Sequence, residues 1–166
     1  MPKCLFILAI FPFVVFSQQK KEVLFVGNSY TYVNDLPNLV KEIAFSFGDT
    51  LLHESSTPGG ASFSAHSSNT QTLAKINQQQ WDYVVLQAQS QEPSLSPSYI
   101  NANVLPAAQL LINAIESSSL CIEPLFFMTW GRKYGDASNC VAYPPVCTYL
   151  GMQERLRARY LEMAFL

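Results

Sequence analysis

Short apolar segments alternate with helical patterns along the chain, and this alternation is the feature that most constrains the fold. The predicted strands span residues 22–26, 50–54, 83–86 and 125–129. The predicted helices span residues 36–47, 70–80, 98–116 and 148–165. Strands that alternate with helices are typical of a parallel sheet with helices on both faces. The sequence therefore predicts an α/β fold with a central parallel sheet, in a single domain spanning residues 18–166.

The first 17 residues have the features of a secretory signal peptide. Lys3 provides a positive start, and an apolar run from Cys4 to Phe16 follows. A membrane-spanning helix needs roughly 20 apolar residues, so this run is too short to span a bilayer stably. We expect a signal peptide at residues 1–17, cleaved before Gln18, and hence a secreted or periplasmic protein without a membrane span. The alternative is a buried strand or helix at the N-terminus.

Charge and composition exclude several classes of protein. Ten Lys and Arg residues against twelve Asp and Glu residues give a net charge of −2. Without a basic surplus the chain cannot neutralise many phosphates, so we expect no nucleic-acid partner. The chain is 49% hydrophobic and 13% charged, which excludes a disordered protein.

The cysteines and histidines predict one disulfide and no metal site. Export permits disulfides, and Cys140 and Cys147 flank a loop that contains two prolines, so we expect them to pair. Cys121 lies in an apolar run, where we expect a buried thiol. His53 lies within a predicted strand, where we expect a structural histidine with satisfied hydrogen bonds. Neither His53 nor His66 has the spacing to the cysteines that a zinc site requires.

Polar residues and glycines follow each predicted strand. Ligands of parallel α/β sheets bind at the carboxyl ends of the strands. The segments at this edge are residues 27–29, 59–60, 87–91 and 130–132. Ser29 lies between the first strand and the next helix, where free backbone N–H groups favour a developing oxyanion. The alternative for Ser29 is a turn serine that caps the chain.

Three of these segments resemble the sequence blocks of the SGNH (GDSL-like) hydrolase family. Gly27-Asn28-Ser29-Tyr30-Thr31 resembles the first block, and Gly60 matches the glycine of the second block. Gln91 falls where the third block has asparagine, and a glutamine also carries an amide N–H. Residues 81–91 and 128–132 are similar to those of an uncharacterised bacterial branch. The resemblance covers most of residues 22–165 and implies a three-layer, flavodoxin-like sandwich.

The resemblance implies a secreted serine esterase that needs no cofactor. Ser29 would attack a carboxylic ester, and the oxyanion would accept hydrogen bonds from the Ser29 N–H, the Gly60 N–H and the Gln91 amide. The substrate would be a small-molecule or carbohydrate ester, an acetyl ester being one case. The candidates for contact with the substrate are Asn28, Gly59, His66 and Arg132.

The family's Asp-x-x-His block, which supplies the catalytic base, is missing from residues 1–166. We therefore expect the sequence to be truncated, the fold to be incomplete at its C-terminus, and turnover to be weak or absent unless His66 acts as the base. Whether this chain is an active enzyme stays open. One alternative is a non-catalytic secreted module that binds glycans or acyl groups, and another is an incompletely folded product.

Overall fold

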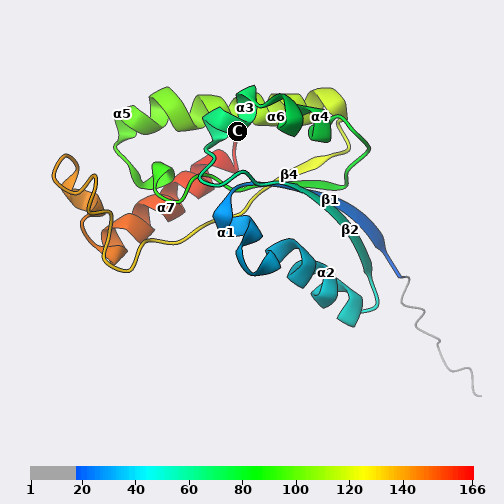
Figure 1. The fold of residues 1–166 in the computed structure, drawn as a ribbon. Coiled ribbons are helices and arrows are strands. Elements are labelled where there is room, and N and C mark those ends of the chain that lie inside the picture. Colours follow the sequence, from blue (N-terminus) through cyan, green and yellow to red (C-terminus); the bar gives the residue numbers. More distant parts are fainter. Residues whose placement is uncertain (1–17) are drawn as a thin grey trace, which may run out of the picture.

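Four parallel strands form one sheet at the centre of a computed structural model that describes residues 18–166 (Figure 1). The strands are β1 (Lys20–Val26), β2 (Thr50–Ser56), β3 (Tyr83–Leu86) and β4 (Glu123–Phe126). Their order across the sheet is β2-β1-β3-β4, and each neighbouring pair is parallel. The carboxyl ends of all four strands therefore meet at one edge. The predicted signal peptide lies outside the described residues.

Helices cover both faces of the sheet. They are α1 (Ser29–Tyr32), α2 (Leu36–Ser46), α3 (Phe63–Ser68), α4 (Thr70–Ile76), α5 (Pro97–Tyr99), α6 (Leu105–Ser118) and α7 (Tyr149–Met163). Figure 1 shows α2 on one face of the sheet, and α3, α4 and α6 on the opposite face. The predicted α/β sandwich with a central parallel sheet is confirmed.

The two central strands provide the middle of the core. Leu24 and Val26 of β1 lie beside Val84 and Leu86 of β3, and all four side chains are fully buried. Burying a side chain of this kind contributes about 1.5–3 kcal/mol. Residues of α6 and α7, Leu111 among them, pack into the same cluster. This burial explains why both strands appear in the sequence as short apolar runs.

Some boundaries differ from the prediction because tertiary contacts extend or shorten the elements. The Ser- and Gly-rich stretch 55–68, which reads as a loop, continues β2 to Ser56 and then forms α3. Phe63 is 1% exposed, and the side chain of Ser62 caps α3 by accepting the N–H of Ala65. Strand β4 ends at Phe126, where its pairing with β3 ends.

The sequence predicts a kink or break at Pro106, within the helix expected at 98–116. A π-helical turn at Ile100–Val104 directly precedes α6, and the N–H of Leu105 donates to the carbonyl of Ile100. Proline has no N–H to donate, so the helix changes its hydrogen-bond pattern just before it. The chain continues as a helix on both sides of this turn.

Two of the expectations on single residues are wrong. Cys121 is exposed rather than buried, because it lies in the turn between α6 and β4. His53 lies in β2, with its ring edge-on to Phe25 at 6.1 Å between centroids. Its buried Nδ1, however, has no hydrogen-bond partner among the described residues.

The expected disulfide, in contrast, is present between Cys140 and Cys147. In residues 18–166 we find no helix with the length and apolarity needed to span a membrane.

Leu24→Ala should lower the free energy of unfolding by about 2–5 kcal/mol, because the substitution leaves a cavity between the central strands and the helices. Leu120→Ala is the matched control, since Leu120 is 89% exposed. Urea unfolding followed by circular dichroism measures both variants. Equal effects of the two substitutions would contradict the position of Leu24 in the core.

Candidate active site

Ser29 lies directly beyond the carboxyl end of β1, as the first residue of the single-turn helix α1. Its side chain is half-buried and lines a cavity of about 440 Å³. Gly27 makes the tight turn between β1 and Ser29 possible. A Cβ atom on Gly27 would lie 2.7 Å from the side-chain oxygen of Gln87 and would collide with the hydroxyl of Thr31. The turn that presents Ser29 therefore requires glycine at this position.

Asn28 connects the ends of three strands. Its Oδ1 accepts the N–H of Tyr30 at 3.1 Å, and its Nδ2 donates to the carbonyl of Ala61 at 2.9 Å. Its backbone N–H donates to Oε1 of Gln87 at 3.0 Å. Asn28 is 2% exposed, so little of its surface is open to a substrate. Its buried hydrogen bonds hold the adjacent Ser29 in place instead.

Gln87 is a site residue that the sequence analysis did not select. It is fully buried, and its Oε1 also accepts the hydroxyl of Thr31 at 2.9 Å. Its Nε2 donates to the carbonyl of Ala88. A buried glutamine amide needs hydrogen-bond partners. Here the oxygen of the amide accepts from two groups in the turn that carries Ser29. Its position directly after a buried apolar strand was the one available signal.

His66 lies beneath the turn and not in the cavity. The residue is fully buried, with Nε2 2.8 Å from the carbonyl oxygen of Gly27 and Nδ1 3.0 Å from the hydroxyl of Thr72. Burial lowers the pKa of His66, although the hydrogen bond to Gly27 opposes this shift. His66 is not among the residues that line the cavity beside Ser29. Both ring nitrogens are already bonded, and the side chain supports the backbone just before Ser29.

The glycine pair after β2 lies in an exposed turn. Gly60 has φ +70°, and a Cβ built on it would meet no atom within 4 Å. Within the described chain its N–H makes no hydrogen bond, and the next residue, Ala61, is tied to Asn28. A Cβ atom placed on Gly59 would lie 3.7 Å from the hydroxyl of Tyr32. The N–H of Gly60 is therefore unpaired within residues 18–166, and it lies next to the residue whose carbonyl binds Asn28.

Arg132 holds the side chain of Gln91, and its own side chain is 37% exposed. Its Nη2 donates to Oε1 of Gln91 and, at 3.2 Å, to the hydroxyl of Ser90. Its Nη1 lies 3.5 Å from Oδ1 of Asp136, which is fully buried. Because Arg132 binds the oxygen of the Gln91 amide, the Nε2 of Gln91 is left to donate elsewhere. No described residue accepts from this Nε2.

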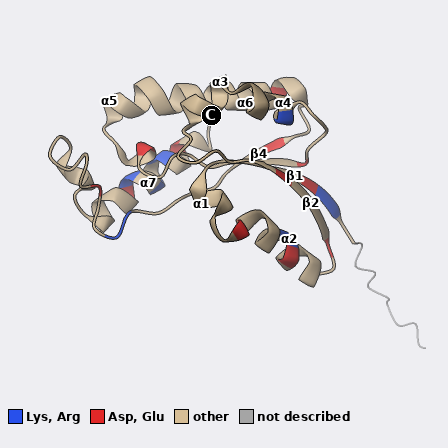
Figure 2. Cartoon of the chain, viewed as in Figure 1, with Lys and Arg blue, Asp and Glu red and all other residues tan. Residues whose placement is uncertain are grey.

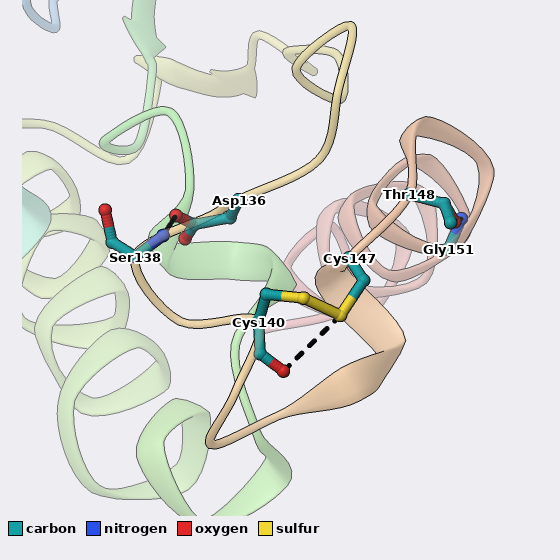
Figure 3. Close-up of a disulfide and its surroundings, with 6 residues drawn as sticks. All are labelled: Asp136, Ser138, Cys140, Cys147, Thr148 and Gly151. Carbon is teal, nitrogen blue, oxygen red and sulfur yellow. Dashed lines mark hydrogen bonds between the residues drawn. A yellow bond between two sulfur atoms is a disulfide. The ribbon is translucent and has the colours of Figure 1, made fainter.

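The loop that carries Arg132 is held by its own contacts. Asp136 accepts the N–H of Ser138 at 3.2 Å and Nδ2 of Asn139 at 2.6 Å. The Cys140–Cys147 disulfide lies next to it, and Thr148 caps α7 by accepting the N–H of Gly151 (Figure 3). The hydrogen bonds of Asp136 and the disulfide therefore stabilise the loop that carries Arg132.

Tyr30 and Trp130 pack against each other at the carboxyl edge, with 5.0 Å between ring centroids. The cavity beside Ser29 has Val33, Leu36 and Leu39 among its lining residues, together with both aromatic rings. A second, more open hollow of about 690 Å³ shares these two rings and is lined by Arg132 and Lys133. Figure 2 shows the basic stretch in the loop that leads to α7. The aromatic pair therefore borders an apolar and a basic hollow.

The described residues offer no constellation for a metal. Across residues 18–166, no three His, Cys, Asp or Glu side chains lie close enough together to hold an ion. The polar groups at the carboxyl edge include the hydroxyls of Ser29 and Tyr30, the amide of Gln91 and the guanidinium of Arg132.

Comparisons with known proteins define the fold class. No protein-family model and no curated protein matches the chain. A protein from Slackia heliotrinireducens described as an SGNH hydrolase matches with a TM-score of 0.69 and 22% identity, over 88% of this chain and 74% of that one. A DUF4886 family protein from Bacteroides uniformis gives 0.70 and 17%, over 88% and 63%.

A mutant of the esterase AlinE4 matches with a TM-score of 0.55 and 16% identity, over 88% of this chain and 71% of that one. The chain thus has the fold of SGNH-like hydrolases. At these identities the likeness concerns the fold, and the residues of the site have to be argued from their own geometry.

The stability of the protein should depend on pH through His66. Its folded pKa lies below that of an unfolded histidine, so the unfolded chain binds the proton more readily. The stabilisation from neutral His66 is complete above about pH 6.5 and decreases as pH falls toward the folded pKa. Urea unfolding between pH 7.5 and 5 measures this slope, which His66→Asn should reduce. His53→Asn is the control and should retain the dependence due to His66.

Proposed function

We propose that the protein is an ester hydrolase of the SGNH type, exported from the cell, with Ser29 as its nucleophile. The observation that carries the proposal is the position of Ser29: it lines a cavity at the carboxyl edge of a parallel sheet, and Asn28 ties it to the turns after β2 and β3. An SGNH hydrolase and an esterase among the proteins of the same fold support an ester-hydrolysing function. Export is supported by the sequence of residues 1–17 alone.

In the proposed reaction, Oγ of Ser29 attacks the ester carbonyl carbon and an Oγ–C bond forms. The carbonyl oxygen becomes an oxyanion that accepts hydrogen bonds from the Ser29 N–H, the Gly60 N–H and Nε2 of Gln91. The bond to the alcohol oxygen then breaks, and the proton of Oγ leaves with the alcohol. Water hydrolyses the acyl-serine in a second step. Arg132 is a positioning residue, because it orients Gln91 through the amide oxygen.

We expect proton transfer to be the slow part of this proposed reaction in residues 18–166. His66 is buried under the site, and His53 lies inside β2, so no histidine among residues 18–166 faces Ser29. An activated ester avoids part of this demand, because p-nitrophenolate leaves without being protonated. Formation of the acyl-serine is therefore a more direct measurement than steady-state turnover.

Ser29→Ala should abolish acylation of the protein by p-nitrophenyl acetate. Both proteins consist of residues 18–166. Mass spectrometry of peptides should find an acetyl group on Ser29 of the protein without a substitution. It should find no acetyl group on the corresponding peptide of the variant. Ser64→Ala is the control, since Ser64 is an exposed serine in α3. Equal labelling of the unmodified protein and Ser29→Ala would remove Ser29 from the mechanism.

Gln91→Glu should slow acylation by about 10²–10³-fold, because a carboxylate keeps the contact with Arg132 but has no N–H for the oxyanion. Gln89→Glu is a matched control of the same charge. The Oε1 of Gln89 only accepts, from the N–H groups of Gln91 and Glu92, and a carboxylate keeps both bonds. Stopped-flow measurement of p-nitrophenol release compares the variants. A large loss in Gln89→Glu with none in Gln91→Glu would assign the donor to Gln89.

A non-catalytic binding module for acyl groups or glycans is the second candidate. The observation that favours it is the absence of a histidine facing Ser29 among the described residues. A protein of this kind would bind its ligand equally well after Ser29→Ala and would never carry an acyl group. The labelling experiment above therefore distinguishes the two functions.

A further inference from the structure

The cavity beside Ser29 is lined mainly by carbon. Apart from Ser29, Tyr30 and Asn34, its lining consists of the side chains Val33, Leu36, Leu39, Phe127 and Trp130. No Lys, Arg, Asp or Glu is among the lining residues. An uncharged, apolar group gains free energy on entering such a space, whereas a sugar or a carboxylate would lose its hydration without compensation.

The size of the cavity exceeds the need of an acetyl group. Its volume is about 440 Å³. If a chain carbon takes about the 30 Å³ of a liquid water molecule, an eight-carbon acyl chain fills roughly half of this space. An acetyl group would leave most of the apolar lining uncovered.

Three of the apolar lining residues are largely exposed to solvent. Val33 is 51% exposed, Leu39 is 49% exposed and Trp130 is 51% exposed. Large apolar side chains that gather around a hollow at this exposure are typical of a ligand-binding site. A chain that enters the cavity would cover these three side chains together.

A strained turn presents this lining. Asn34 and Asp35 both have left-handed backbone angles, with φ of 60° and 52°. Residues other than glycine adopt this conformation at a cost, and two in succession are rare. The turn separates α1 from α2 and places Leu36 and Leu39, which are three positions apart on one face of α2, beside Ser29. Strain of this kind collects at sites where a ligand is held.

We propose that this cavity is the acyl pocket and that the protein prefers esters of apolar acyl chains of about six to ten carbons over acetyl esters. This inference rests on the proposed function, since it assigns a substrate class to the same serine. It replaces the acetyl group, expected from the sequence, with a longer chain. Leu39 and Val33 are the residues that set the preference.

The preference is measured by acylation of Ser29 with p-nitrophenyl acetate, butyrate and octanoate at equal concentrations below saturation. Each methylene that is buried should raise the rate constant by up to about fourfold. Because the cavity is partly open, we expect octanoate to exceed acetate by roughly 10- to 100-fold. Equal rates for the two esters, or faster reaction of acetate, would overturn the acyl pocket while leaving Ser29 as the nucleophile.

Leu39→Glu places a charge in the pocket and should lower the octanoate-to-acetate ratio at least tenfold. Ile43→Glu is the matched control: it adds the same charge to the same helix, at a residue that is 60% exposed and does not line the cavity. The control should keep the ratio. A ratio that falls equally in both variants, or in neither, would overturn the role of Leu39.

A binding measurement separates failure of the pocket from failure of the ester hydrolase. Trp130 lines the cavity and Trp81 is buried in the core, so fluorescence of the Ser29→Ala variant should respond to the neutral ester ethyl octanoate in a saturable way and not to ethyl acetate. Leu39→Glu should weaken this response and Ile43→Glu should not. Saturable binding of ethyl octanoate without any acylation of Ser29 would keep the pocket and overturn the ester hydrolase. No binding and no chain-length preference would overturn the pocket.

Discussion

The hydrogen bonds of Asn28 are the interactions on which the site depends. Through one buried side chain and one backbone N–H, the turn after β1 is bound to Ala61 beyond β2 and to Gln87 beyond β3. All three segments are irregular, and loops of this kind have few apolar contacts of their own to hold them. Because an unpaired amide in the interior is costly, these bonds hold the loops in one arrangement. Ser29 takes its position from that arrangement.

A second group of contacts completes the carboxyl edge from a distant part of the chain. Arg132 follows β4, lies against the buried Asp136, and reaches the amide oxygen of Gln91 beyond β3. The disulfide between Cys140 and Cys147 braces the same loop. Holding a glutamine by its oxygen leaves its N–H groups directed elsewhere, which suits an oxyanion donor. The aromatic pair of Tyr30 and Trp130 then separates the apolar cavity from the basic hollow.

The sequence can select candidate site residues by their position after a strand, but it cannot tell which of them are buried. Ser29, Gly60 and Gln91 are candidates because each comes after a predicted strand, at the carboxyl edge of the sheet. The sequence offers Asn28 and His66 as candidates for substrate contact, since no local pattern distinguishes a buried hydrogen-bonding role from an exposed one. Their burial, at 2% and 0% exposure, assigns both to the support of the turn. Gln87 was missed for the same reason.

The chain by itself determined the alternation of strands and helices, and with it the parallel sheet and the edge at which a site can form. These follow from local patterns of apolar residues, which act over a few positions in the sequence. The tertiary structure alone decided that Leu36 and Leu39 line a cavity with Ser29, and that Arg132 holds Gln91 from 41 positions away. Such contacts depend on how loops that follow different strands pack against each other, and a local sequence pattern does not determine this packing.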